Sequence, residues 1–271
     1  MTEKLGWTLL FLAIAVAAVT GVSYKKGLGF GWQDLKCRDF TPFVGKLAWW
    51  YDWRVSGKDQ CTTDDSLEYV PMLWNLAHVP MITNIRGNKY LLGFNEPNFR
   101  AQSNISPELA AEKWVQLQKN VPANVKMVSP AAAPCDTNDK STCNMQFSTW
   151  FTRFFARCNQ LGGCRIDYVA THHYTCNAYD LLGFLGAVYN QVKKPLWVTE
   201  FSCPWTRYDA TPIKNFMRAA IPMLEKSSFI YRYAWFAHRL QSCLGSFLCP
   251  TISLIDTNGQ LTELGRLYLS L

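Results

Sequence analysis

The chain has 271 residues, of which 49% are apolar and 14% aromatic, and its formal net charge is +7. This composition favours a dense globular core, and the length suits one α/β barrel, a fold that often takes about 250 residues as a single domain. The Lys and Arg residues are scattered and form no basic stripe with interleaved aromatic residues. We therefore expect no nucleic-acid partner.

An uncharged run over residues 5–22 follows Lys4 and ends in small residues, which is the layout of a signal peptide. The run also reaches the lower limit for spanning a bilayer, so an uncleaved signal anchor is the alternative. We divide the chain into a signal segment, residues 1–22, and one domain over residues 23–271. We expect a secreted, extracellular monomer that has no membrane contact unless the run stays uncleaved.

Ten cysteines independently support export, because an even number without Cys-x-x-Cys spacing is typical of disulfides and not of zinc or thioredoxin-like sites. The sequence leaves their connectivity open. Close spacing favours three pairs, which are Cys135 with Cys143, Cys158 with Cys164, and Cys243 with Cys249. If neighbouring loops pair, the remaining cysteines form Cys37 with Cys61 and Cys176 with Cys203. Asn104 begins an N-glycosylation sequon, which matters only in an exported chain.

Short apolar runs alternate with helical patterns from residue 24 to the end, without a repeat or linker. The expected strands are residues 26–30, 46–52, 69–74, 90–95, 126–129, 167–172, 196–200 and 231–236. Apolar residues at helical spacing predict helices within 147–155, 181–192, 213–224 and 264–271, and Pro222 is expected to kink the third. Ser106 and Pro107 form the start of another helix. Eight strand–helix units predict an α/β fold, a single (β/α)8 TIM barrel braced by disulfides.

Two of the expected strands end on a glutamate, Glu96 and Glu200. A glutamate at the end of an apolar run is costly to bury without a partner or a task. All strands of a barrel, including the fourth and seventh, end at the face that carries the active site in barrel enzymes. Glycosidases use a pair of carboxyl groups in one cleft, so the two glutamates predict a glycosidase. The alternative is that they form two unrelated salt bridges at the rim of the barrel.

From about residue 25 to its end, the chain resembles glycoside hydrolase family 128, secreted β-1,3-glucanases with a barrel fold. A match to Asn95-Glu96-Pro97 alone is weak, but the matching segments together, in this order, are specific. These segments are residues 25–28, 50–53, 69–74, 93–98, 167–174, 197–201, 234–236 and 261–265.

The resemblance implies that Glu96 is the acid/base and Glu200 the nucleophile, with neighbours that set their pKa values apart. It also implies that Asn95 binds the sugar 2-hydroxyl; the alternative is an Asn that caps the backbone. His172 and Tyr174 share one face of the sixth strand, and in the family this strand holds the nucleophile.

Aromatic residues complete the expected site. The resemblance makes Trp235 the floor of the cleavage subsite, and the residues that could stack on sugar rings are Trp50, Tyr51, Trp53, Trp74 and Trp205. The sequence does not say which face of the second strand points inward. Two positions depart from the family, because His173 stands where Trp is common and Asn98 where Asp is common.

The chain is therefore expected to be a retaining hydrolase of β-1,3-glucan or its oligosaccharides, with endo or exo action left open. The alternatives are a non-catalytic β-glucan-binding barrel and a hydrolase of another β-linked glycan. The four His residues are too dispersed for a metal site, and no phosphate or dinucleotide loop is present. We expect no cofactor.

Overall fold

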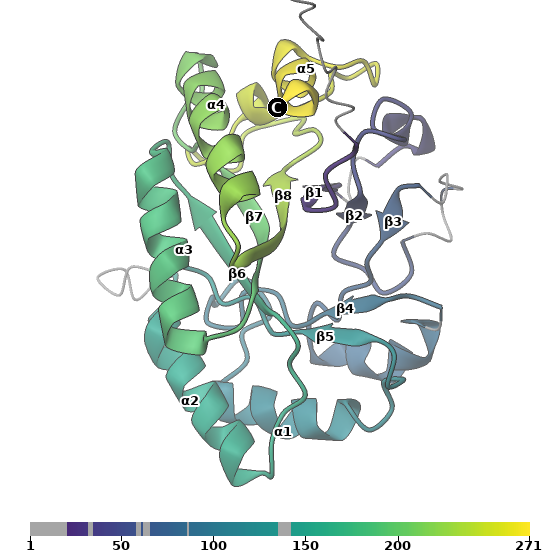
Figure 1. Cartoon of the computed structure of the whole chain (residues 1–271), viewed down its shortest axis with the longest axis vertical. Helices are drawn as coiled ribbons and strands as arrows, with labels where there is room; N and C mark the ends of the chain where they lie inside the picture. Colours follow the sequence, from purple (N-terminus) through teal and green to yellow (C-terminus); the bar gives the residue numbers. More distant parts are fainter. Residues whose placement is uncertain (1–20, 32–34, 58–60, 62–65, 86, 135–141) are drawn as a thin grey trace, which may run out of the picture.

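The computed structural model describes residues 21–31, 35–57, 61, 66–85, 87–134 and 142–271. Residues 5–20 of the expected signal run lie outside this part of the chain. Within the described residues, no helix is long and apolar enough to cross a membrane. Strands and helices alternate along the chain, and the helices α1 to α4 lie outside the strands (Figure 1).

All eight expected strands are present. They are β1 (Lys26–Gly29), β2 (Trp49–Tyr51), β3 (Glu68–Tyr69), β4 (Tyr90–Leu92), β5 (Lys126–Val128), β6 (Val169–Tyr174), β7 (Leu196–Ser202) and β8 (Ile230–Phe236). The third is much shorter than expected, because the run that continues to Trp74 contains Pro71, which has no N–H to donate to a neighbouring strand.

Parallel pairing joins the strands in the order of the chain. One sheet has the order β3-β2-β1-β8-β7-β6, and β4 pairs with β5. Single parallel bridges connect the two sheets, one between Met72 and Leu92 and one between Val128 and Tyr168. The ring of neighbours is therefore complete, as a (β/α)8 barrel requires.

The helices form the outer layer. They are α1 (Pro107–Leu117), α2 (Phe147–Gln160), α3 (Ala178–Val192), α4 (Thr211–Lys226) and α5 (Glu263–Ser270), with short 3-10 helices η1 (Cys37–Phe40), η3 (Leu76–Ile85) and η4 (Pro250–Ile252). The Ser106 side chain caps α1 as expected, because it accepts a hydrogen bond from the amide of Leu109. Helix α4 continues past Pro222 to Lys226.

The alternation of side chains along each strand separates two cores. The barrel interior holds Trp49, Tyr51, Trp53, Trp197 and other apolar residues. The layer between the strands and the helices holds Trp50 and many residues from the apolar faces of the helices. Strand two thus turns its odd-numbered side chains inward, which the sequence had left open.

Four disulfides occur among the described residues, and all four agree with the expected pairs. They are Cys37–Cys61, Cys158–Cys164, Cys176–Cys203 and Cys243–Cys249. Cys143 is also disulfide-bonded, whereas its expected partner Cys135 lies outside the described residues.

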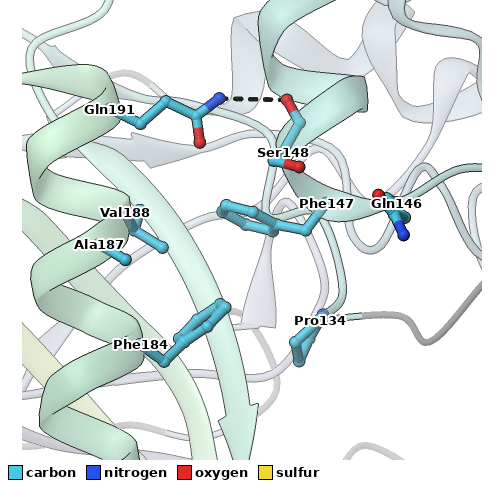
Figure 2. A pocket seen from close by; sticks show the side chains of 8 residues that line it. All are labelled: Pro134, Gln146, Phe147, Ser148, Phe184, Ala187, Val188 and Gln191. Atoms are coloured by element: carbon cyan, nitrogen blue, oxygen red, sulfur yellow. Dashed lines mark hydrogen bonds between the residues drawn. The ribbon is translucent and has the colours of Figure 1, made fainter.

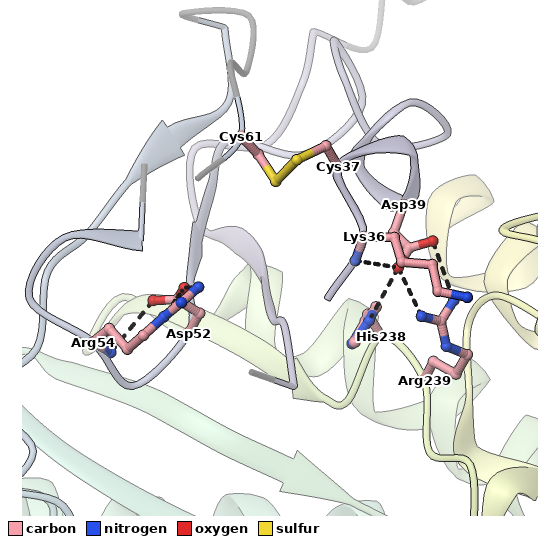
Figure 3. The surroundings of a disulfide bond; sticks show 8 residues. All are labelled: Lys36, Cys37, Asp39, Asp52, Arg54, Cys61, His238 and Arg239. Carbon is pink, nitrogen blue, oxygen red and sulfur yellow. Dashed lines mark hydrogen bonds and ion pairs between the residues drawn. A yellow bond between two sulfur atoms is a disulfide. The ribbon is translucent and has the colours of Figure 1, made fainter. Parts of the chain in front are cut away.

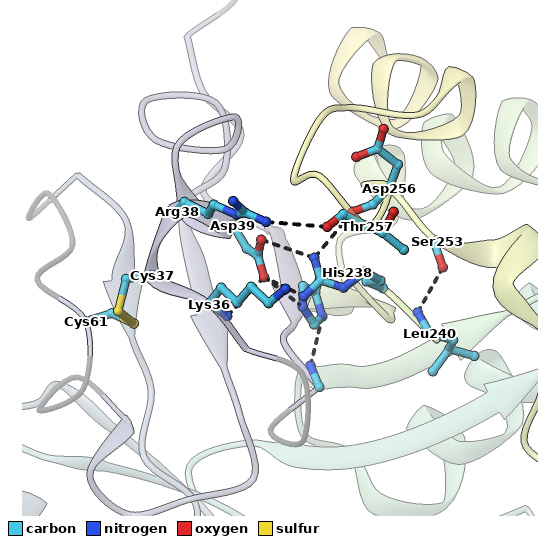
Figure 4. A network of polar contacts seen from close by, with 12 residues as sticks. Lys36, Cys37, Arg38, Asp39, Cys61, His238, Leu240, Ser253, Asp256 and Thr257 are labelled. Atoms are coloured by element: carbon cyan, nitrogen blue, oxygen red, sulfur yellow. Dashed lines mark hydrogen bonds and ion pairs between the residues drawn. A yellow bond between two sulfur atoms is a disulfide. The ribbon is translucent and has the colours of Figure 1, made fainter. Parts of the chain in front are cut away.

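A buried polar network ties the loop after β1 to the loop after β8 (Figure 4). The Arg239 guanidinium donates to both carboxylate oxygens of Asp39, at 3.1 and 2.8 Å, and His238 lies 3.7 Å from the same carboxylate. The Nδ1 atom of His238 accepts a hydrogen bond from the amide of Gly31 at 3.0 Å. The Cys37–Cys61 disulfide lies close to this network (Figure 3). These contacts hold the loops that follow β1, β2 and β8 near one another.

Candidate active site

The local fold of β7 turns Glu200 toward the barrel interior. Trp197 already points inward, so strict alternation would turn Glu200, three residues later, outward. The pairing with β6 shifts here, because Thr171 pairs with Val198 whereas His172 pairs with Glu200. Thr199 is the extra residue of a β-bulge, a device that redirects the side chains that follow it.

Glu96 lies beyond β4, at the end of the extended segment. Its amide donates to Ala131 of the neighbouring segment at 2.9 Å, and its backbone has a left-handed conformation with φ of 40°. This conformation is rare for a residue with a side chain and marks a position that the surrounding structure holds in place.

The two glutamates meet at His172. The Nδ1 atom of His172 lies 2.8 Å from Oε1 of Glu96 and 3.4 Å from Oε2 of Glu200. Carboxylate oxygens of the two glutamates and a nitrogen of the imidazole all lie within 4.8 Å of one another. The carboxyl groups from the ends of strands four and seven therefore share one small site.

Glu200 receives two further hydrogen bonds from aromatic side chains. The indole N–H of Trp53 donates to Oε1 at 2.9 Å, and the hydroxyl of Tyr174 donates to Oε2 at 2.6 Å. Tyr51 packs against Trp53, with ring centroids 4.7 Å apart, and its hydroxyl donates to the carbonyl of Thr199. Together with His172, these three expected residues fix the position of Glu200 directly or through the neighbouring Thr199.

Burial and charge act against each other at these groups. Burial raises the pKa of Glu200 and the Glu96 carboxylate adds to this, while His172, Tyr174 and Trp53 favour the ionised form. Burial lowers the pKa of His172, but the two carboxylates outweigh it and raise this pKa above its usual value. Burial and the nearby carboxylates raise the pKa of Tyr174 far above its usual range, so its hydroxyl remains a donor.

A loop after β2 presents Trp53 to Glu200. The side chain of the fully buried Asp52 accepts a hydrogen bond from the Arg54 guanidinium (Figure 3). Asp52 also accepts a hydrogen bond from the Tyr69 hydroxyl, and this hydroxyl accepts one from the amide of Gly57. Trp53, between the two charged residues, has a left-handed backbone with φ of 60°. The network supports a conformation that an ordinary residue seldom adopts.

The structure contradicts two of the residues expected to line the site. Trp50 is fully buried in the layer between the strands and the helices, so it cannot stack on a sugar ring. Trp235 is fully buried outside the barrel, where it packs against Phe201 and Phe216 and donates to the carbonyl of Ile252. Alternation along β8 turns Ala234 and its even-numbered neighbours inward and Trp235 outward. Trp235 therefore cannot form the floor of the site.

Phe236 lies on the inner side instead, with its ring 5.6 Å from that of Trp53 and 6.0 Å from that of Tyr174. Phe247, from the loop after β8, lies 5.1 Å from the Tyr174 ring. Sequence reasoning did not identify either residue. Alternation along β8 could have indicated Phe236, whereas no local pattern marks Phe247.

The remaining expected residues lie around the carboxylates at different distances from them. The carbonyl of the half-buried Trp74 accepts the amide of Asn95, so both lie beside Glu96 in the fold. The Asn95 side chain is buried and donates to Gln102, while its Oδ1 atom has no hydrogen-bond partner among the residues that the structure describes. Trp205 lies at the exposed rim and touches Phe247.

The two departures from the family pattern have structural explanations. The His173 ring stacks on Phe184 and lies 3.1 Å from the Asp180 carboxylate, so this side chain faces α3 and not the barrel interior. The buried Asn98 amide donates to the carbonyls of Ala133 and Met145 and accepts the amide of Ala133. An ionised Asp at this position could not donate either of those hydrogen bonds.

Among the described residues, Glu96, His172 and Glu200 are the group that could hold a divalent cation, since they offer three ligand atoms close together. Both oxygens of Glu200 already accept hydrogen bonds, and a cation would have to displace those donors.

Elsewhere, a groove of about 420 Å³ lies between α2 and α3 and is lined by Phe147, Phe184 and their neighbours (Figure 2). The groove belongs to the outer helix layer.

Comparisons with known proteins agree with this architecture. Residues 27–268 match the family described as "Glycosyl hydrolase catalytic core". The chain is 26% identical over 265 residues to Alkali-sensitive linkage protein 1 of Schizosaccharomyces pombe. That alignment covers 94% of this chain and 45% of the relative, so the chain spans less than half of the relative's length.

Two solved structures show the similarity in three dimensions. A GH128 subgroup II endo-β-1,3-glucanase from Sorangium cellulosum is 30% identical, with a TM-score of 0.77 over 91% of this chain and 98% of that one. A GH128 subgroup III curdlan-specific exo-β-1,3-glucanase from Blastomyces gilchristii is 26% identical, with a TM-score of 0.71 over 91% and 98% of the two chains. Similar enzymes of both endo and exo type therefore share this fold.

Proposed function

Since this chain belongs to the glycosyl hydrolase catalytic core family, and within it to GH128, we propose that it hydrolyses β-1,3-glucan with retention of anomeric configuration. The observation that carries the proposal is the close approach of Glu96 and Glu200, since one carboxylate oxygen of each lies within 4.8 Å of one of the other. Retaining glycosidases hold their carboxyl groups about 5 to 5.5 Å apart, whereas inverting enzymes leave ~6.5 to 9.5 Å for a water molecule. The short separation supports a double displacement.

The two glutamates have different surroundings, which supports different roles for them. Glu200 is held by Trp53, Tyr174 and His172, so its carboxylate is fixed in the position that attack on the anomeric carbon requires. Glu96 contacts His172 alone among these donors, and its side chain is 13% exposed. We assign Glu200 as the nucleophile and Glu96 as the acid/base.

The reaction then has two steps. Glu200 attacks the anomeric carbon while Glu96 donates its proton to the departing glycosidic oxygen, and a glycosyl ester on Glu200 results. Glu96, now ionised, takes a proton from water as that water attacks the same carbon, which restores both carboxyl groups. The unpartnered Oδ1 atom of Asn95 supports its role as an acceptor for a sugar hydroxyl.

Two measurements on β-1,3-glucan test this proposal, namely the release of sugar and the identity of the anomer that forms first. Wild-type protein should release reducing ends from laminarin, with the β-anomer appearing first in the proton NMR spectrum. Glu96→Gln and Glu200→Gln should each remove this activity. Binding without release would favour the non-catalytic β-glucan-binding barrel, and cleavage of only a differently linked β-glucan would reassign the substrate.

Export through the secretory pathway is part of the proposal. Four disulfides among the described residues support an oxidising compartment, where such crosslinks form and persist. Secretion, cleavage of the segment 1–22, glycosylation at Asn104 and a monomeric state remain predictions. Mass measurement of the mature protein from culture medium, before and after removal of N-glycans, tests the first three.

A further inference from the structure

A tryptophan stands exposed at the rim of the barrel, next to the strand that carries Glu200. Trp205 follows β7, and 68% of its surface is exposed although its position is fixed. Its amide donates to the carbonyl of Phe247 at 2.7 Å, and its ring lies edge-to-face against the Phe247 ring at 5.3 Å. A large apolar ring that stays in solvent forgoes the favourable free energy of burial. Such an exposed ring is typical of a site that binds a ligand.

Further rings connect Trp205 to the catalytic carboxylate. The Phe247 ring contacts Tyr174 at 5.1 Å, and Tyr174 donates its hydroxyl to Glu200. The Phe236 ring also contacts Tyr174, with centroids 6.0 Å apart, and contacts the Trp53 ring at 5.6 Å. We call the continuous series formed by Trp53, Phe236, Tyr174, Phe247 and Trp205 the aromatic wall.

Two disulfides hold the outer part of the aromatic wall. Cys243–Cys249 closes the loop that carries Phe247, and within this loop the amide of Leu244 donates to the carbonyl of Leu248 at 2.7 Å. Cys176–Cys203 joins the segments after β6 and β7, two residues before Trp205. The outer rings are therefore arranged before any ligand binds, which lowers the entropic cost of binding.

We propose that Trp205 and Phe247 bind glucose rings of the β-1,3-glucan chain beyond the two that the cleaved bond joins. This inference rests on the proposed function, and it names two residues that would determine which lengths of glucan chain the enzyme prefers. The faces of β-linked glucose rings carry aliphatic hydrogens, which suit contact with an aromatic ring. A wall that begins at Glu200 and ends in solvent would guide such a chain away from the cleavage point.

Activity on long and short substrates tests the inference. For Trp205→Ala we expect about a three- to tenfold loss in the ratio of kcat/KM for laminarihexaose to that for laminaribiose, from an increase in KM for the longer sugar. Phe247→Ala should act in the same direction, but it also removes a ring that packs against Tyr174, so Trp205→Ala is the decisive variant. Tyr208→Ala is the matched control, because Tyr208 is 87% exposed in the same loop and stacks on Arg207 outside the aromatic wall.

Calorimetric binding of laminarihexaose, measured in a Glu200→Gln background, separates the two proposals. Weaker binding by Trp205→Ala, with Tyr208→Ala unchanged, supports the inference even if turnover is absent. A wild-type enzyme that cleaves laminarihexaose while Trp205→Ala keeps the same ratio and the same affinity overturns the inference alone. A chain that neither binds nor cleaves β-1,3-glucan overturns both proposals.

Discussion

The charge of Glu200 depends on a few hydrogen-bond donors and charged neighbours in a buried site. Burial and Glu96 favour the protonated acid, whereas His172, Tyr174 and Trp53 favour the carboxylate that a nucleophile needs. Tyr174 has the shortest contact among these, at 2.6 Å. Loss of one donor should therefore change the pH at which the enzyme becomes active, in addition to its rate.

We expect Tyr174→Phe to move the acidic limb of the pH profile of kcat/KM to higher pH. The substitution removes a donor that stabilises ionised Glu200, so the pKa of Glu200 rises further and a higher pH is needed to ionise it. Tyr233→Phe is the control, since it removes a tyrosine–glutamate hydrogen bond, to Glu225, away from the site. An acidic limb that stays in place or moves to lower pH would contradict the assigned role of Glu200.

At the scale of single residues, the sequence predicted which residues meet around the two glutamates better than it predicted the surrounding aromatic residues. Glu96, Glu200, His172 and Tyr174 were expected together, and the structure brings them together. Phe247 could not be predicted, because its contact with Tyr174 depends on how a loop folds back over the barrel.

At the scale of elements, strand alternation predicted which side chains share a face but not where a strand departs from regularity. His172 and Tyr174 lie on one face of β6 as expected. In β7, the bulge at Thr199 lets both Trp197 and Glu200 point inward. A bulge arises from the registers of two neighbouring strands, so the sequence of one strand does not reveal it.

The disulfides connect different elements and should contribute unequally to the free energy of unfolding. Replacing Cys176 and Cys203 by Ser opens a crosslink between residues 27 apart and should lower the free energy of unfolding by about 3.5 kcal/mol. The same change at Cys158 and Cys164, only 6 apart, should cost about 2.2 kcal/mol. Urea denaturation of the two double variants measures both values.

The first double variant should also lose activity on laminarihexaose, because its disulfide lies between Tyr174 and Trp205 in the sequence and fixes the segments that carry them. The second, at the end of α2, serves as the control and should retain activity. Equal activity in both variants would contradict a bracing role for Cys176–Cys203 at the site.

At the scale of the whole molecule, the eight strand–helix units were predictable because each has a local pattern and barrel closure follows from their order. The long-range polar contacts were not predictable. Asp39 lies 200 residues before Arg239 in the sequence, and these two residues form a buried cluster with His238 only in the closed barrel.

This cluster should make stability depend on acidity. Burial raises the pKa of Asp39, but His238, Arg239 and the amide of Lys36 outweigh it and lower this pKa to about 2. A carboxyl whose folded pKa lies below its unfolded value of 3.8 stabilises the fold above that value. The contribution is lost as the pH falls through the folded pKa.

Asp39→Asn should lower the free energy of unfolding by about 3 to 5 kcal/mol near neutral pH, because Arg239 keeps a buried charge without its partner. The difference from wild type should shrink between pH 4 and pH 2, as measured by denaturant unfolding across that range. Glu263→Gln, which breaks an exposed ion pair with Lys214, should have little effect at any pH. A difference for Asp39→Asn that stays constant down to pH 2 would refute the linkage.

The most direct test of the central claim, that Glu200 is the nucleophile and Glu96 the acid/base of a retaining enzyme, is the configuration of the glycosyl azide formed by rescued variants. With an aryl β-laminaribioside, Glu200→Gly and azide should give the α-glycosyl azide, because the anion attacks from the vacated face. Glu96→Ala should give the β-azide, because the intermediate on Glu200 still forms. Exchanged configurations in the NMR spectra would reverse the two roles, and an inverted product from the wild-type enzyme would contradict the double displacement.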